Sequence, residues 1–115
     1  MAFNDIEQKK IDNALAAFLA TTRPPPEVRV KMDIGYRQSG QSIELVEIRP
    51  DWKNPKIIRE QPFAKATYVN TRKVWKVFWQ RADLKWHAYE PAPAAKDIEA
   101  FLAIVLDDEH GCFFG

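Results

Sequence analysis

The chain has 115 residues, of which 46% are hydrophobic and 29% are charged. These values are ordinary for a globular protein and exclude an intrinsically disordered chain, and at this length we expect a single domain with its own hydrophobic core. The single cysteine, Cys112, excludes an internal disulfide. The first residues do not resemble a signal peptide, and the longest apolar runs are too short to cross a bilayer. We therefore expect a cytoplasmic protein without a membrane partner.

The net charge of +1 hides an uneven distribution of charge along the chain. Residues 27–86 hold thirteen Lys and Arg against seven Asp and Glu, whereas residues 87–115 hold one Lys against six acids. The basic region and the acidic tail could attract each other and so stabilise the fold. Alternatively, the basic region could present a positive face to nucleic acid or to another acidic partner.

A helix is predicted from Asn4 to about Thr21. Its start, Asn4-Asp5-Ile6-Glu7, matches a capping box, in which the Asn4 side chain accepts from the Glu7 amide and the Glu7 side chain reaches back. An apolar stripe follows at helical spacing and consists of Ile11, Ala14, Leu15, Phe18 and Leu19. Pro24-Pro25-Pro26 ends the helix, because proline cannot continue it.

The next segment, Glu27 to Arg37, alternates between apolar and polar side chains, which predicts a strand. Its inward residues would be Val28, Val30, Met32, Ile34 and Tyr36. A hairpin turn is predicted at Ser39-Gly40, and pairing across it sets Tyr36 opposite Ile43 and Ile34 opposite Leu45. The same register brings Glu47 and Arg49 to the end of the inward face, where they could form a rim ion pair or line a small polar pocket. Residues 50–62 are predicted to form a loop.

Phe63 to Val69 is predicted to be the third strand, and the richest pattern of the chain follows it. Residues 73–90 alternate as two strands joined at Arg81-Ala82-Asp83-Leu84. Turns of two and of four residues give the same register, with Trp79 opposite Trp86 and Phe78 opposite His87. In that register three tryptophans, Trp75, Trp79 and Trp86, share the core face.

A second helix is predicted from Lys96 to about Leu106, with a core stripe of Ile98, Phe101, Leu102 and Val105. Three acids at its C-terminal end oppose the helix dipole, so we expect them to pair with basic groups elsewhere. Phe113 and Phe114 are expected to anchor the tail in the core. The predicted fold is therefore α+β, an antiparallel β-meander of about five strands with an N-terminal and a C-terminal helix packed on one face.

The chain also resembles a known family. The motif Trp-x-Val-x-Trp-Gln-Arg-Ala-Asp-Leu-Lys-Trp-His-x-Tyr begins at Trp75, and it occurs with Glu47-Ile48-Arg49-Pro50, Ala64-Lys65-Ala66-Thr67-Tyr68 and Phe113-Phe114-Gly115. Together these segments resemble the small uncharacterised bacterial proteins grouped as the domain of unknown function DUF3024, and the likeness covers nearly the whole chain. The resemblance implies one α+β domain and a bacterial origin. It implies no activity, because the family has none assigned.

Catalytic and metal sites have weak support in the sequence. The four glycines form no phosphate-binding fingerprint, and His110-Gly111-Cys112 offers two metal ligands where a dedicated site needs three or four. We therefore expect no cofactor and no metal. Cys112 with a histidine is the one nucleophile and base pairing on offer. His87 could act as a general acid or base with Glu47 and Arg49 as polar partners, although a histidine on a half-exposed strand is more often a plain cross-strand partner.

The second face of the predicted sheet mixes apolar, aromatic and basic side chains. A sheet face in water should be more uniformly polar, so we expect a helix, a second copy of the chain or a ligand to cover part of it. The candidate binding residues there are Lys31, Lys65, Lys76, Phe78, Lys85, His87 and Tyr89.

These observations favour a non-enzymatic binding or interaction module that uses the second face, with homodimerisation as one way to use it. Basic side chains interleaved with aromatic rings are also typical of surfaces that bind single-stranded nucleic acid, which is an alternative. A small enzyme with His87 as acid or base is a further alternative.

Overall fold

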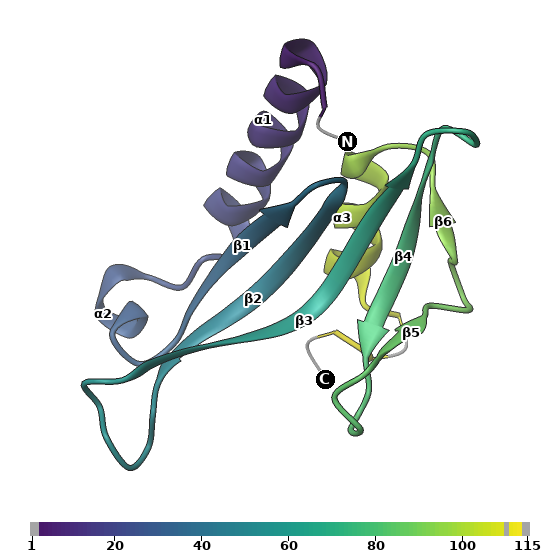
Figure 1. Cartoon of the computed structure of the whole chain (residues 1–115). Helices are drawn as coiled ribbons and strands as arrows, with labels where there is room; N and C mark the ends of the chain where they lie inside the picture. The colour runs from purple at the N-terminus through teal and green to yellow at the C-terminus, as the bar shows by residue number, and fades with distance from the viewer. Residues whose placement is uncertain (1–2, 110, 114–115) are drawn as a thin grey trace.

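The computed structural model describes residues 3–109 and 111–113. The elements are α1 (Asp5–Thr22), α2 (Pro26–Arg29), β1 (Asp33–Ser39), β2 (Ser42–Pro50), β3 (Ile58–Val69), β4 (Val74–Gln80), β5 (Trp86–Ala88), β6 (Ala94–Ala95) and α3 (Ile98–Asp107). Strands β1 to β5 lie side by side in chain order, each antiparallel to the next, and β6 pairs with β4. Figure 1 shows α1 and α3 behind the same face of the sheet. The predicted α+β meander with two terminal helices on one face is confirmed.

Both long helices form where local signals predict them. Asn4 caps α1: its side chain accepts from the Glu7 amide at 2.8 Å, and the Asn4 amide donates to the Glu7 carboxylate at 3.0 Å. Asp97 caps α3 by accepting from the Ala100 amide at 2.8 Å. Within the described part of the chain, no helix combines the length and the apolar character that crossing a bilayer requires.

The hydrophobic core lies between the two helices and the sheet face that they cover. It is filled from α1, from α3 and from alternate positions of the central strands, including Leu15, Phe18, Ile43, Leu45, Val77, Phe101 and Val105. Trp75 is buried in this core and Trp79 packs against it. The predicted apolar stripes of both helices are confirmed, because their central residues are buried.

The strand predicted to begin at Glu27 is shorter than expected. Pro26–Arg29 forms one helical turn instead, β1 begins at Asp33, and Val30 is 72% exposed. Proline is favoured at the first position of a helix, which explains why a turn forms here in spite of the alternating pattern. The prediction that Val28 and Val30 point inward was wrong.

The first hairpin turns one residue later than predicted. Ser39 lies opposite Ser42, so Gly40 and Gln41 form the turn, and Gly40 has a φ of 58°. Tyr36 consequently faces Leu45, and Ile34 faces Glu47. A shift of two residues in pairing leaves every side chain on its predicted face, so the core assignment of Ile34, Ile43 and Leu45 is unaffected.

Much of the predicted loop over residues 50–62 is an extended arm. Strand β2 continues to Pro50 and β3 begins at Ile58, so the two strands run together past the rest of the sheet (Figure 1). A bulge interrupts their register: Leu45 lies opposite Ala64 but Val46 lies opposite Pro62, so Phe63 is the extra residue of β3 at the bulge. Bulges increase the local twist, and Phe63 and Ala64 are both buried here.

The tryptophan hairpin differs from prediction by one residue in register. Trp86 lies opposite Gln80, and His87 lies opposite Trp79. The Leu84 amide donates to the Arg81 carbonyl, and the Arg81 amide donates to the Lys85 carbonyl, so the turn has three residues. An odd turn length moves every β5 side chain to the opposite face. The prediction that Trp86 lies in the core was therefore wrong.

Tyr89, which was predicted to lie on the second face, is buried in the core instead. It is 2% exposed, and its ring centroid lies 4.9 Å from that of Phe113. Phe113 thus anchors the tail as predicted, while Phe114 lies outside the described residues. In the described part of the chain, no ion pair joins Asp107 or Glu109 to a basic side chain, so the predicted pairing of these acids is not seen.

Candidate binding surface

The sheet face turned away from α1 and α3, here called the open face, has no helix over it in the described part of the chain (Figure 1). The strand registers place one row of side chains across its middle. From β1 to β5, this row consists of Arg37, Glu44, Lys65, Phe78 and Ala88. The row passes from charged residues on β1 and β2 to apolar and aromatic residues on β4 and β5.

Lys65, Phe78 and Trp86 form an aromatic–lysine cluster on the open face. The Lys65 ammonium nitrogen lies 5.1 Å from the centroid of the Phe78 ring and 5.1 Å from that of the Trp86 ring. Both distances fall within the range of a cation–π interaction. Lys65 thereby covers part of both rings, and all three side chains remain half-buried.

The acids of the open face are already engaged in ion pairs. Arg37 contacts the Glu44 carboxylate at 2.7 Å and the Glu60 carboxylate at 3.7 Å. In contrast, Lys65 and Lys76 form no ion pair among the described residues. Lys65 and Lys76 therefore carry positive charge on the open face without a direct ion pair, although Glu44 lies opposite Lys65 in the row.

Apolar side chains of β2 also belong to the open face. Val46 is 1% exposed although no described helix lies over it, so side chains of the open face itself close around it. Gly35 lies opposite Val46 on β1, and a β-carbon at Gly35 would stand 3.1 Å from the Ile48 side chain. The missing side chain thus makes room for Ile48.

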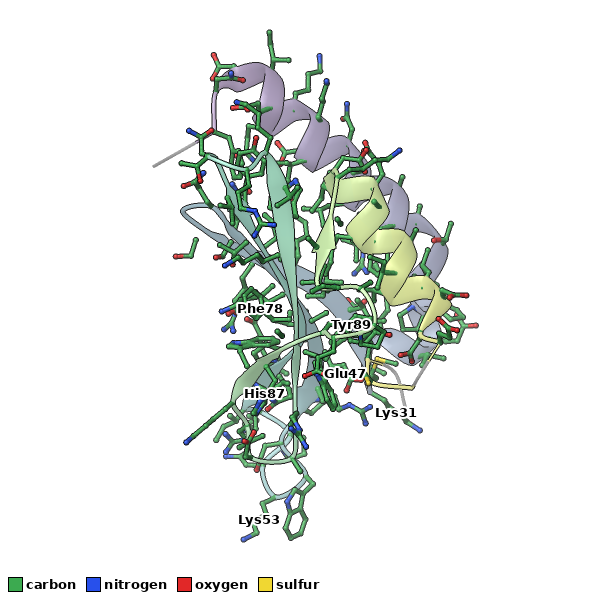
Figure 2. The ribbon with its side chains drawn as sticks, turned by 90° about the vertical axis from the view of Figure 1, so that its right-hand side faces the viewer. Lys31, Glu47, Lys53, Phe78, His87 and Tyr89 are labelled. Carbon is green, nitrogen blue, oxygen red and sulfur yellow. The ribbon has the colours of Figure 1, made fainter. Side chains whose placement is uncertain are left out.

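The structure brings some of the predicted binding residues together and separates others. Lys65, Lys76 and Phe78 share the open face, whereas Lys85 lies between the turn and β5, one residue before Trp86, and the shifted register does not place it on that face. Figure 2 shows Phe78 on one side of the sheet and Tyr89 on the side of the helices. Lys31 lies in the turn between α2 and β1, away from the cluster. Tyr89 is a core residue.

His87 does not belong to the open face either. It lies opposite Trp79, and its Nε2 atom is 2.9 Å from the Asp83 carboxylate. A backbone hydrogen bond from Lys85, followed by the contact with His87, lowers the pKa of Asp83. His87 lines a hollow of about 370 Å³ together with Tyr89 and Cys112. Burial raises the pKa of the Cys112 thiol, with a further contribution from Asp108, which is the opposite of what a nucleophilic cysteine needs.

Glu47 and Arg49 form the predicted ion pair, with 3.1 Å between Arg49 Nη2 and Glu47 Oε2. They also line a hollow of about 400 Å³ along the arm, together with Lys31 and Trp52. This hollow does not include His87. The three residues of the enzyme hypothesis therefore do not converge in one of these hollows.

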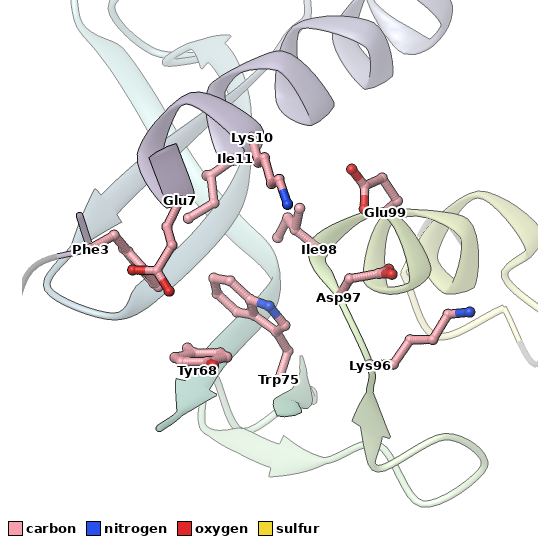
Figure 3. A pocket seen from close by; sticks show the side chains of 10 residues that line it. All are labelled: Phe3, Glu7, Lys10, Ile11, Tyr68, Trp75, Lys96, Asp97, Ile98 and Glu99. Atoms are coloured by element: carbon pink, nitrogen blue, oxygen red, sulfur yellow. The ribbon is translucent and has the colours of Figure 1, made fainter. Parts of the chain in front are cut away.

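A third hollow, of about 230 Å³, lies between the start of α1, the end of β3 and the start of α3 (Figure 3). Phe3 stacks on Trp75 along its wall, with 5.5 Å between the ring centroids. Two of its carboxylates, Glu7 and Asp97, serve as helix caps. Lysines and acids both surround it, so its electrostatics favour neither an anion nor a cation.

No group of three or more potential metal ligands occurs within residues 3–109 and 111–113. His110, which the sequence pairs with Cys112 as a potential ligand, lies outside the described residues.

Trp86 is the aromatic residue of the open face that the sequence does not predict. A three-residue turn usually has Gly or Asn at the last position, where the backbone is left-handed. Leu84 holds that position with a φ of 62° and gives no such signal. The Asp83 side chain accepts from the Lys85 amide at 2.9 Å, a local contact that favours a turn here but does not fix its length.

The protein-family model described as "Domain of unknown function (DUF3024)" matches residues 3–115. Neither a curated protein nor a solved structure matches the chain.

Proposed function

Because the chain belongs to the DUF3024 family, whose function is unknown, we propose a role from the geometry of the open face. The protein is a non-enzymatic binding module, and the open face binds an acidic partner. The observation that carries this proposal is the imbalance of charge on β3 and β4. Lys65 and Lys76 have no ion-pair partner among the described residues, whereas Glu44 and Glu60 both contact Arg37.

Exposed lysines steer an anionic partner and lower its dissociation constant most strongly at low ionic strength. The adjoining rings of Phe78 and Trp86 supply apolar area that such a partner can bury. A second copy packed face to face would bring two sets of unneutralised lysines together. An acidic partner therefore fits this face better than a homodimer does.

Heparin affinity chromatography tests the proposal with two variants of equal net charge. The first, K65Q/K76Q, removes both lysines of the open face. The matched control, K9Q/K10Q, removes two exposed lysines from α1. We expect wild type to be retained, and the first variant to elute at a clearly lower salt concentration than the control.

Equal elution of the two double variants would show that retention reflects net charge alone and would contradict the proposal. Absence of any retention of wild type at low salt would contradict it as well. Sedimentation at the same protein concentration reports whether a second copy occupies the face, and a dimer disrupted by the open-face substitutions would overturn the assignment to an acidic partner.

A further inference from the structure

We infer that the acidic partner is single-stranded nucleic acid, whose bases stack on Phe78 and Trp86. This inference rests on the proposed function and adds a statement about the chemistry of the partner. The aromatic–lysine cluster carries it, because the cluster combines two half-buried rings of the open face with an ammonium group that has no ion-pair partner among the described residues and lies 5.1 Å from both ring centroids.

The aromatic–lysine cluster contains the two kinds of side chain that bind a single strand of nucleic acid. Nucleobases stack on aromatic side chains, and phosphates pair with lysine. In the unliganded protein the Lys65 ammonium occupies the ring faces of Phe78 and Trp86. A phosphate can draw this flexible side chain aside and leave both ring faces to the bases, so charge and stacking act together.

The spacing of these side chains on the sheet suits a single nucleic-acid strand that crosses the open face. Lys65 lies directly opposite Phe78, and Lys76 lies opposite Thr67 in the next row of the same face. Lys76 is two residues from Phe78 along β4, a distance of about 7 Å for extended backbone. A chain that alternates flat rings with negative charges therefore meets a ring and a lysine in turn.

Two other anionic partners fit the cluster less well. An acidic peptide would pair with the lysines but would leave the ring faces of Phe78 and Trp86 without a planar partner. A nucleic-acid duplex keeps the faces of its bases inside its own stack, so it cannot offer them to the sheet. Both nevertheless serve as outcomes of the test.

Fluorescence anisotropy of a short labelled oligothymidylate measures the affinity directly. The comparison ligands are the same strand annealed to its complement, and polyglutamate as an anion without bases. The variants F78L and W86L remove one ring each while they keep an apolar side chain. W52L is the matched control, because Trp52 is an exposed tryptophan (85%) at the tip of the arm, outside the cluster.

We expect F78L and W86L each to weaken oligothymidylate binding by roughly 5- to 150-fold, which is the range for loss of one stacked base. W52L should bind as wild type does. K65Q should reduce the salt dependence of binding by about 0.7 in the slope of log K against log salt, the value for one phosphate contact of a single strand. W86F should keep most of the affinity while it removes the quenching of Trp86 fluorescence that stacking causes.

Several results would overturn the inference. If F78L and W86L bind oligothymidylate as W52L does, while circular dichroism shows them folded, the rings do not stack on bases. Equal affinity for the duplex would have the same meaning, and tighter binding of polyglutamate would assign the face to an acidic protein segment. In each of these cases the lysine-dependent retention on heparin persists, so the proposed function stands while the inference fails.

Discussion

At the scale of single residues, Leu84 holds the strained position of the turn that sets which side chains reach the open face. Its left-handed backbone, with a φ of 62°, closes the three-residue turn and thereby turns Trp86 away from the core. A leucine in this conformation has its β-carbon too close to the following carbonyl, which costs about 1–2 kcal/mol. Its side chain is 68% exposed and contributes little packing in return.

The variant L84G should therefore be more stable than wild type. Glycine adopts the left-handed region without strain, although it gives back part of the gain through the greater entropy of the unfolded chain. We expect an increase of about 0.5–1 kcal/mol in the free energy of unfolding, measured by urea denaturation. A82G is the control in the same turn: Ala82 has no positive φ, so glycine there should lower stability. An L84G variant less stable than A82G would contradict this account of the turn.

At the scale of elements, the sequence predicts what local signals determine and misses what depends on pairing. The helices α1 and α3 follow from their caps and apolar stripes, all of which lie within a few residues of one another. The assignment of side chains in β3 and β4 to the two faces of the sheet follows from the alternation of residue types along each strand. The side on which Trp86 lies depends instead on whether a turn has an even or odd number of residues, and the alternating pattern of two strands is compatible with either.

The start of β1 was missed for a related reason. Val28 and Val30 alternate with polar residues, yet Pro26 favours a helical turn, and the alternation there has no partner strand to pair with. Of the candidate site, the sequence therefore supplied Lys65, Lys76 and Phe78. It could not supply Trp86, and it wrongly placed Tyr89 and His87 beside them.

The end of α1 is tied to the start of β1 by Arg23 and Asp33. The guanidinium of Arg23 donates to both oxygens of Asp33, at 2.8 and 2.7 Å. The Arg23 hydrogen bonds lower the pKa of Asp33, although desolvation partly opposes them. Because the folded-state pKa lies below that of the unfolded chain, this contact contributes stability above the unfolded pKa of about 3.9 and loses it as the pH falls through the folded value.

We therefore expect D33N to be less stable than wild type at neutral pH, with the difference shrinking as the pH falls below about 4. Thermal unfolding over a pH series measures this. Arg23 is well exposed, so the effect at neutral pH should be under about 1 kcal/mol. R23Q should show the same pH dependence of stability. The double variant should lose little more stability than either single variant does. Additive losses, or a difference that grows toward acid, would rule out this contact as the source.

At the scale of the whole molecule, the chain consists of a helix-covered sheet and an arm that extends past it. Strand β3 pairs with β4 from Ala64 to Val69, so residues 58–62 have no pairing on that side. The arm also carries exposed apolar side chains, among them Trp52, Ile57 and Ile58. A ribbon of two strands without a covering layer is only marginally stable, so the two parts should differ in local stability.

Hydrogen exchange measured by mass spectrometry should separate the two parts within a single strand. We expect amides of residues 58–61 to exchange much faster than amides of residues 65–68, because local opening of the arm costs less than opening of the covered sheet. The two segments belong to the same strand, so each serves as the reference for the other. Equal protection would mean that the arm is as stable as the sheet, for instance because another molecule covers it.

The three-residue turn at Ala82-Asp83-Leu84 has a consequence for relatives of this protein. A deletion or insertion of one residue there would exchange the two sides of β5, sending the indole of Trp86 under the helices and the imidazole of His87 out to solvent. Substitutions within the turn would leave the sides as they are. Another member of the family must therefore have a turn of the same length before the same open face can be inferred for it. The identity of the residues in the turn matters less.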